Sequence, residues 1–218
     1  MTQEKHGIQI FDEKGCPVLE IGPHLVRENS EFAEKIGIIA ASWAQAEVNL
    51  NCLFAVLLDT TPDEAANQLK KYRSAARTAD GARKLAAEYL TGAELESVTK
   101  ALNQLDLVRL RRNRVQHDVW AKKGDDNQTM FAIHSDQYLA FTTNVVAATE
   151  LAIPEGEKSE RVINLANEFA ATITKGHTIS DLQEIDQELN LASKSLMEAM
   201  FFRISQRLKE KGAALSQR

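Results

Sequence analysis

Four arginines and a histidine lie close together between residues 109 and 120, where the sequence reads Arg109-Leu110-Arg111-Arg112-Asn113-Arg114-Val115-Gln116-His117-Asp118-Val119-Trp120. In a helix that turns about 100° per residue, the apolar side chains at positions 105, 108, 115 and 119 fall on one stripe. Arg112 and Gln116 fall into the same stripe. The segment therefore predicts a long helix that places polar side chains where core residues are expected.

The basic run has two interpretations. A run of cations on a helix is often a solvated face. The spacing favours a second interpretation, because five polar residues follow the i, i+3, i+4, i+7, i+8 pattern that lines one side of a helix. These residues are Arg109, Arg112, Asn113, Gln116 and His117. Charged side chains are rarely buried without partners, so this face should meet an acid across a core, a subunit interface or a ligand groove.

The segment Arg112-Asn113-x-x-x-His117 resembles the Arg-polar-x-x-x-His signature of the HEPN family of small helical proteins, many of which are ribonucleases. The helical surroundings and Trp120 soon after the histidine add to this resemblance. It implies a mainly α fold, a HEPN-like helical bundle, with Arg112 and His117 as the catalytic pair. It also implies that Asn113, Arg109, Gln116 and Arg114 contact the RNA substrate.

An acidic residue on an early helix often faces the motif in HEPN proteins, and Glu47 matches that description here. The resemblance makes Glu47 the supporting counter-ion of Arg112. The residues alone leave a second interpretation equally open, in which Glu47 is a carboxylate on the flank of an apolar helix face.

Composition predicts a globular and helix-rich protein, since 44% of the 218 residues are hydrophobic, 26% are charged, and there are only 4 Pro and 10 Gly. This length favours one domain with an appendage over two full domains. The net charge of −5 excludes a broad basic surface for nonspecific nucleic-acid binding, and no specific DNA contact is expected. Any RNA contact must therefore be local. It is expected at the segment 109–123, which contains six cations and one anion.

Several classes of site find no support in the sequence. No glycine-rich phosphate loop and no paired Cys/His ligand set are present, so neither a cofactor nor a metal is expected. Cys16 and Cys52 are interpreted as reduced thiols. Residues 1–7 lack the apolar core of a signal peptide, and no later run is long and apolar enough for a membrane helix. We therefore expect a cytoplasmic protein that makes no membrane contact.

The remaining elements follow from periodicity and turn signals. Residues 8–11 and 18–21 predict a β-hairpin within an appendage at 1–27, which could pack on the helical body or form a dimer contact. A HEPN-like helical domain is expected over 28–211, with a second hairpin as an insert at about 128–143 and a frayed tail at 212–218. The expected helices cover residues 30–58, 62–77, 82–90, 93–120, 159–174 and 180–211, with 145–153 open between strand and helix.

An arginine with a histidine suffices for RNA cleavage through the neighbouring 2′-hydroxyl, because this reaction needs a base, an acid and a cation but no metal. One chain supplies one imidazole for two proton transfers, and a symmetric dimer would supply two. The resemblance implies a homodimer cleft, products that carry a 2′,3′-cyclic phosphate and a 5′-hydroxyl, and a toxin or defence role with an antitoxin or regulatory partner. The alternative is a noncatalytic HEPN-like module that binds nucleotide or RNA or serves assembly.

Overall fold

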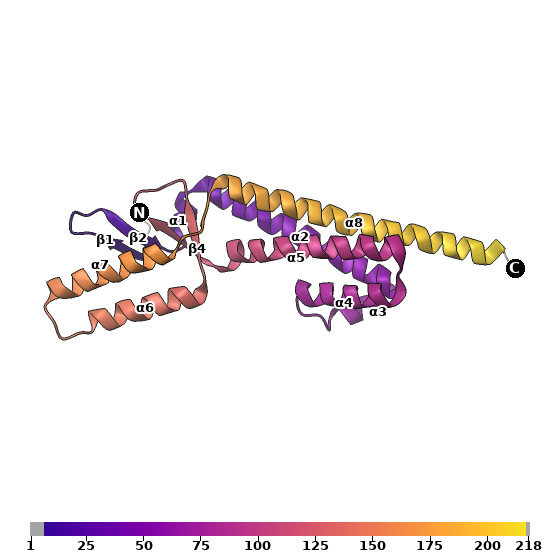
Figure 1. Cartoon of the computed structure of the whole chain (residues 1–218), viewed down its shortest axis with the longest axis horizontal. Helices are drawn as coiled ribbons and strands as arrows, with labels where there is room; N and C mark the ends of the chain where they lie inside the picture. The colour runs from indigo at the N-terminus through magenta and orange to yellow at the C-terminus, as the bar shows by residue number, and fades with distance from the viewer. Residues whose placement is uncertain (1–6, 217–218) are drawn as a thin grey trace. The chain divides into compact units, whose positions relative to one another are not determined.

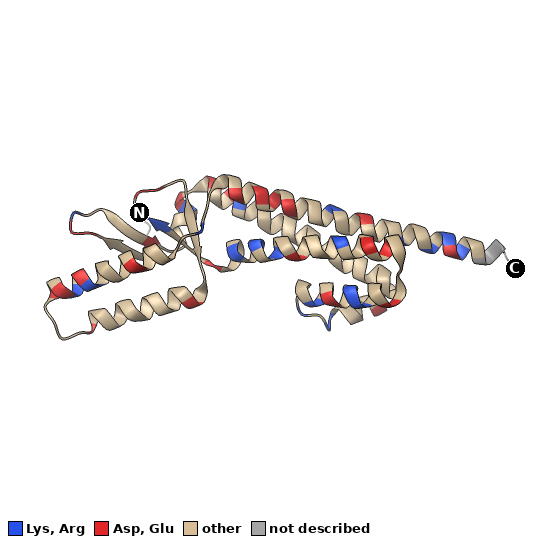
Figure 2. Cartoon of the chain, in the orientation of Figure 1, with Lys and Arg blue, Asp and Glu red and all other residues tan. Residues whose placement is uncertain are grey.

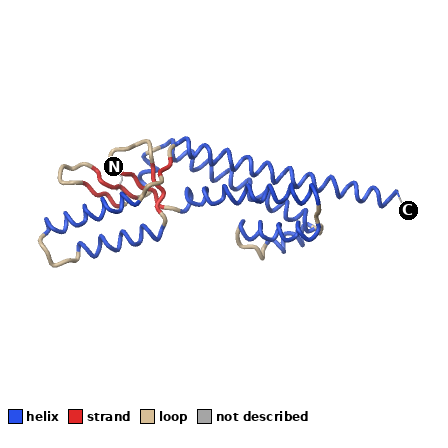
Figure 3. Tube along the Cα trace, viewed as in Figure 1, coloured by secondary structure: helices blue, strands red, loops and turns tan. Residues whose placement is uncertain are grey.

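The computed structural model describes residues 7–216, so the expectations for residues 1–6 and 217–218 lie outside the described part of the chain. The described chain is mainly helical and contains a small antiparallel sheet (Figures 1 and 3). It divides into two compact units. We call residues 7–37 and 113–184 the sheet unit, and residues 38–112 and 185–216 the helical unit. None of the described helices combines the length and apolar character needed to cross a membrane.

The sheet unit is built on five strands in the order β1-β2-β3-β4-β5, and each neighbouring pair is antiparallel. The strands are β1 (Ile8–Phe11), β2 (Pro17–Ile21), β3 (Val119–Lys123), β4 (Met130–Ile133) and β5 (Gly176–His177). Gly15 has a φ of 78° in the β1–β2 turn, a backbone conformation that favours glycine. This confirms the predicted N-terminal hairpin, which pairs through β2 with β3 rather than standing alone.

One face of the sheet forms an apolar core. Side chains that include Leu19, Ile21 and Ile133 are fully buried there. Helices α6 (Ser135–Thr149) and α7 (Glu155–Thr172) lie along the sheet (Figure 1). They supply Phe141 and Phe169, whose rings stack with centroids 4.4 Å apart. An isolated hairpin is marginal in water, so this cover explains why the short strands are stable.

The other face of the sheet carries polar side chains. Gln9, Glu20 and Lys122 lie in register on β1, β2 and β3. His24 of the short helix α1 (His24–Glu28) approaches Glu20 to 3.6 Å, and Gln9 donates a hydrogen bond to the same Glu20 oxygen at 2.9 Å. Glu20 is 8% exposed, so these contacts compensate for the burial of its carboxylate.

The helical unit packs parts of three long helices with two shorter ones (Figure 3). The long helices are α2 (Ser30–Leu58), α5 (Gly92–His117) and α8 (Ile179–Ser216), and the short ones are α3 (Pro62–Leu69) and α4 (Ala75–Tyr89). Each boundary between the two units falls within one of the long helices. The core of the helical unit is aliphatic and includes Leu50, Leu53, Leu102, Leu105 and Leu189.

Polar contacts fix the pairing of α2 with α8 inside the helical unit. Ser42 donates a hydrogen bond to Asp186 at 2.5 Å, and the Asn49 amide donates to the Ser193 hydroxyl at 2.9 Å. Because hydrogen bonds need defined distances and angles, these two contacts set the register of the helices in a way that apolar packing alone does not.

The region after α2 differs from the prediction of helices at 62–77 and 82–90. Helix α3 starts at residue 62 as predicted, and Thr61 caps it, since its side chain accepts a hydrogen bond from the Glu64 N–H. The break comes at residues 70–74, however, and Ser74 caps a helix that runs through the expected break at 78–81. Gly81 explains the error: a Cβ there would lie 2.8 Å from the Tyr72 ring, so this glycine permits close packing and does not end a helix.

The second predicted hairpin, at about 128–143, is wrong in its second strand. Residues 130–133 are a strand, but they pair with β3, and residues 135–149 form α6. The helix starts because the His134 side chain accepts a hydrogen bond from the Asp136 N–H at its N-terminus. The motif helix accordingly ends at His117, and Trp120, predicted to be helical, lies in β3.

The C-terminal half also needs corrections. The helix expected at 159–174 begins earlier, at Glu155 directly after Pro154. The last helix starts at Ile179, where Thr178 Oγ1 accepts a hydrogen bond from the Asp181 N–H, and it continues through 212–216, where a frayed tail was expected. The helix at 30–58 is confirmed. The described chain divides into two compact units, each built from separate parts of the sequence, and the helical domain expected over 28–211 contributes to both.

Candidate functional site

Helix α5 carries every residue of the predicted site except Glu47, and Figure 2 shows the cations that gather toward its C-terminal end. The boundary between the two units falls between Arg112 and Asn113. Arg109, Arg111 and Arg112 therefore belong to the helical unit, and the residues from Asn113 onward belong to the sheet unit.

Arg112 is half-buried, and its guanidinium carbon lies 5.0 Å from the centre of the Trp43 ring. This distance is within the range of a cation–π interaction, which orients the planar group. Burial lowers the pKa of Arg112 from its ordinary value, and the negative charge of Glu47 on α2 partly opposes that shift. The structure thus places the predicted acid where it acts electrostatically on the motif arginine, and it adds Trp43 as an aromatic support.

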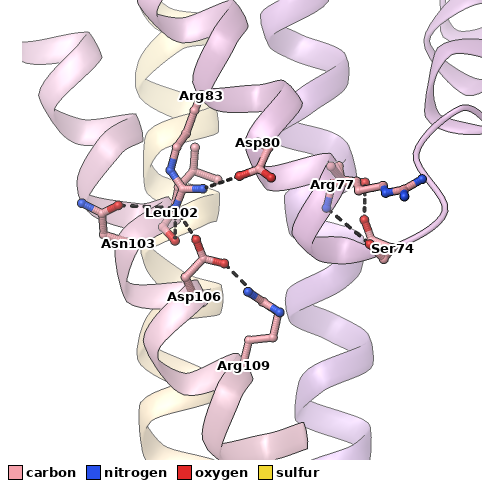
Figure 4. Close-up of polar contacts among 9 residues, drawn as sticks. Ser74, Arg77, Asp80, Arg83, Leu102, Asn103, Asp106 and Arg109 are labelled. Carbon is pink, nitrogen blue, oxygen red and sulfur yellow. Dashed lines mark hydrogen bonds and ion pairs between the residues drawn. The ribbon is translucent and has the colours of Figure 1, made fainter.

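Arg109 belongs to a network that links α5 with α4. Its Nε donates to Asp106 at 3.2 Å, and the same carboxylate forms an ion pair with Arg83 (Figure 4). Arg83 also donates to the Leu102 carbonyl at 3.3 Å and pairs with Asp80. These contacts hold two helices together, so Arg109 has a structural role in addition to its place in the predicted site.

Arg111 pairs with Glu188 of α8 at 2.5 Å, again inside the helical unit. The two side chains are 34% and 39% exposed, so the pair lies at the surface between the two helices.

In the sheet unit, two residues expected to contact substrate are engaged with the protein itself. Arg114 forms an ion pair with Asp118 and donates a hydrogen bond to the Ala132 carbonyl at 3.0 Å. The Gln116 amide donates to the Ile36 carbonyl at 3.1 Å. Both contacts join the end of α5 to neighbouring segments of the sheet unit.

The other two motif positions in the sheet unit differ in exposure. Asn113 is half-buried, whereas His117 is exposed and is the last residue of α5. An exposed imidazole can exchange protons with solvent or with a bound ligand, which is the property that acid–base chemistry requires.

Most of the six cations between residues 109 and 123 contact acidic or carbonyl groups of the protein itself. Arg109, Arg111 and Arg114 have carboxylate partners, as described above. Lys122 lies 3.8 Å from Glu20, and the Lys123 ammonium donates to the Ala170 and Ile173 carbonyls at 3.1 and 2.6 Å. Positive charge available to a polyanion is therefore smaller here than the count of six cations predicts.

Some of these partners could have been found from the sequence. Asp106 is three residues before Arg109 and Asp118 is four residues after Arg114, and both spacings place the side chains side by side on a helix. Glu188 is 77 residues from Arg111, so no local pattern reveals that pair. The position of Trp43 under Arg112 likewise depends on how α2 packs against α5, which no local pattern reveals.

Within residues 7–216, no three His, Cys, Asp or Glu side chains are grouped so that they could hold a metal ion. Comparisons with protein-family models, curated proteins and solved structures found no match to this chain. Function is therefore inferred from the residues of α5 and their contacts.

Proposed function

We propose that the protein is a metal-independent endoribonuclease of the HEPN type, with Arg112 and His117 as its catalytic residues. The observation that supports this proposal most is the contrast between these two side chains on one helix. Arg112 is half-buried and oriented by Trp43, whereas His117 is exposed at the helix end. An oriented cation and an accessible imidazole are the two groups that cleavage through the 2′-hydroxyl requires.

The reaction assigns each group one role. An imidazole accepts the proton of the ribose 2′-hydroxyl, and the 2′-oxygen attacks the adjacent phosphorus. The Arg112 guanidinium stabilises the extra negative charge on the phosphate oxygens, for which its planar fork is suited. A second, protonated imidazole gives its proton to the 5′-oxygen as the phosphorus–oxygen bond breaks. The products are a 2′,3′-cyclic phosphate and a 5′-hydroxyl.

Two proton transfers and one histidine per motif favour a homodimer in which two copies of His117 share one cleft. Glu47 supports Arg112 in this proposal, and Asn113 remains a candidate for contact with RNA. Arg109, Arg114 and Gln116 have structural partners, so they would reach RNA only by exchanging those partners. The biological setting we propose is a cytoplasmic toxin or defence effector held in check by an antitoxin or regulatory protein.

A second candidate is a noncatalytic module that binds RNA or nucleotide or serves assembly. The pairing of the basic side chains favours it, because ion pairs with acidic residues of the same chain are what a purely structural cluster would contain. Fold alone does not separate the two candidates.

The experiment that tests the proposal is digestion of single-stranded and loop RNA by the purified protein in EDTA. We expect cleavage, and we expect His117→Ala to lower its rate by about 10²–10⁴-fold with folding intact. His134→Asn is the matched control, since His134 is also exposed but lies at the start of α6, and asparagine can keep its capping hydrogen bond. Cleavage that needs magnesium, or that survives His117→Ala unchanged, contradicts the proposal. RNA binding without cleavage on several RNAs supports the noncatalytic module.

A further inference from the structure

Helix α6 of the sheet unit exposes a surface with almost no charge. Most residues between 135 and 149 are exposed, yet Asp136 is the only charged one among them. Figure 2 shows the contrast with α7, because α6 is almost entirely tan whereas α7 carries charges of both signs. A surface helix normally presents charged side chains on the side that faces solvent. The outer side of α6 lacks the charges that keep such a helix in contact with water.

Two apolar side chains project from the outer side of α6. Leu139 is 66% exposed and Val146 is 49% exposed, and their spacing of seven residues places them two turns apart on one side of the helix. Phe141 and Ala148 follow two residues after each of them, which is about 200° further round the helix, and both are buried. Helix α6 is thus apolar on two opposite sides, of which the described chain covers one.

A groove between α6 and α7 extends this uncharged surface. It has a volume of about 550 Å³, and its lining includes Asn144, Ala147, Leu151, Asn164, Leu165 and Glu168. The wall on the α6 side consists of small or uncharged side chains, so another element can approach it closely. A common way to fill such a groove is an amphipathic helix that lays its apolar side into it.

The charges around the groove select between occupants. Residues 135–172 contain six acidic residues and two basic ones, Lys158 and Arg161. Asp136 and Glu150 lie at the two ends of α6, and Glu168 lines the groove. A second copy of the chain would bring one acidic surface against another, and RNA would be repelled in the same way. The complementary occupant is a basic one.

We propose that the α6–α7 face, formed by the outer side of α6 and the groove beside it, binds a basic amphipathic helix of a partner protein. The apolar side of that helix covers Leu139 and Val146 and extends into the groove. Its lysines or arginines approach the carboxylates at the ends of α6 and in the groove. The face contains neither Arg112 nor His117, so this binding goes beyond the proposed ribonuclease and holds whether or not the protein cuts RNA.

The probe that tests the proposal is a synthetic helical peptide of about 15 residues, the length of α6. Leucines at positions i, i+3, i+4 and i+7 give it an apolar side, and lysines occupy the other positions. Titrated into the isotope-labelled full chain, it should bind saturably and change the NMR chemical shifts of residues on α6 and α7. The same peptide with glutamate in place of every lysine should not bind.

A pair of variants locates the binding. Val146→Arg should weaken the affinity for the lysine peptide by about 10-fold or more, because it removes an apolar contact and places a cation against a basic helix. Leu107→Arg is the matched control, since Leu107 is 73% exposed on α5 in the helical unit and the substitution adds the same charge. This control should bind the peptide as the wild type does. Circular dichroism should show unchanged helix content for both variants, because both side chains are exposed.

Three results overturn the proposal. The first is a wild type that does not bind the lysine peptide. The second is equal affinity of the peptide for Val146→Arg, Leu107→Arg and the wild type, which would indicate a nonspecific attraction between opposite charges. The third is a wild-type dimer that Val146→Arg dissociates, because the face would then hold a second copy of the chain. None of these measurements involves RNA cleavage, so their outcome is independent of the ribonuclease proposal.

Discussion

The guanidinium of Arg112 is oriented by an aromatic ring and lies near an acidic residue. Its guanidinium lies over Trp43, and burial, which lowers its pKa, is partly opposed by Glu47. A lysine would carry the same charge, but it has neither the planar surface that stacks on an indole nor the two-pronged geometry that matches a phosphate.

We therefore predict that Arg112→Lys lowers the rate of RNA cleavage by about 10- to 100-fold. This decrease is somewhat smaller than the decrease expected when a donor that stabilises the transition state is removed entirely. Single-turnover kinetics on a labelled RNA measure the effect. Arg77→Lys serves as the control, because Arg77 is exposed on α4, and its rate should match that of the wild type. Equal rates for Arg112→Lys and wild type would show that only the charge matters at this position.

Asp126 in the β3–β4 turn gives a prediction of pH dependence. Its carboxylate accepts hydrogen bonds from the Gln128 N–H at 2.7 Å and the Thr129 N–H at 3.3 Å. The Gln128 contact is the largest cause that lowers its pKa below the ordinary value of 3.8. Because the pKa is lower in the folded state, the ionised form stabilises the fold, and this contribution is lost as the pH falls through the folded-state pKa.

The midpoint for Asp126 in a carbon-13 NMR titration of the carboxyl groups should accordingly lie below 3.8. The difference in free energy of unfolding between wild type and Asp126→Ala should be constant near neutral pH and shrink below about pH 4. A midpoint at or above the ordinary value would mean that the turn does not hold the carboxylate as described.

At the scale of elements, Asp106 joins α5 to α4 by accepting from both Arg109 and Arg83. Its side chain is 29% exposed, so solvent screens these contacts only in part. Asp106→Asn would leave two guanidinium groups near each other without a shared anion. We predict a loss of about 1–3 kcal/mol in the free energy of unfolding, measured with urea.

Asp80→Asn is the matched control for that measurement. Asp80 also pairs with Arg83, but its side chain is 69% exposed. An exposed pair of this kind contributes about 0–1 kcal/mol, so the control should be close to wild type. Equal effects of the two substitutions would show that Asp106 does not organise the junction of α4 and α5.

The sequence predicted elements well where a signal was local. The hairpin at 8–21, the helix at 30–58 and the helix start at residue 62 depend on turn residues and periodicity, and all three are present. It failed where packing overrides a local signal. A break between helices was predicted at 78–81, where the close contact of Gly81 with Tyr72 is invisible in the sequence. The second strand of the hairpin at about 128–143 was predicted where the His134 cap starts a helix.

The candidate site follows the same rule. Motif residues and their position late in a long helix were predictable from spacing, and α5 contains them. The acidic partner of Arg111 was not predictable from spacing, because Arg111 and Glu188 meet only through the packing of α5 against α8. A count of charges along the chain overstates a basic surface whenever acids from other helices lie against it.

For the whole molecule, a net charge of −5 and paired cations predict RNA binding that depends weakly on salt. Each phosphate neutralised in a single strand contributes about −0.7 to the slope of log affinity against log salt, so we expect a slope no steeper than about −2 per chain. Fluorescence anisotropy of a labelled RNA with the His117→Ala variant gives this slope. A slope near −4 or steeper would show that the paired arginines and lysines exchange their carboxylates for phosphates.

The measurement that tests the central claim most directly is the chemistry of the RNA ends after digestion in EDTA. If the neighbouring 2′-hydroxyl attacks, with Arg112 and His117 as its catalysts, mass spectrometry should find a 2′,3′-cyclic phosphate on one fragment and a 5′-hydroxyl on the next. An RNA with a 2′-deoxy nucleotide at the cleaved position should resist, and these products should disappear in His117→Ala. Fragments that end in a 3′-hydroxyl and a 5′-phosphate, or a deoxy-substituted RNA that is cut equally well, would contradict the mechanism.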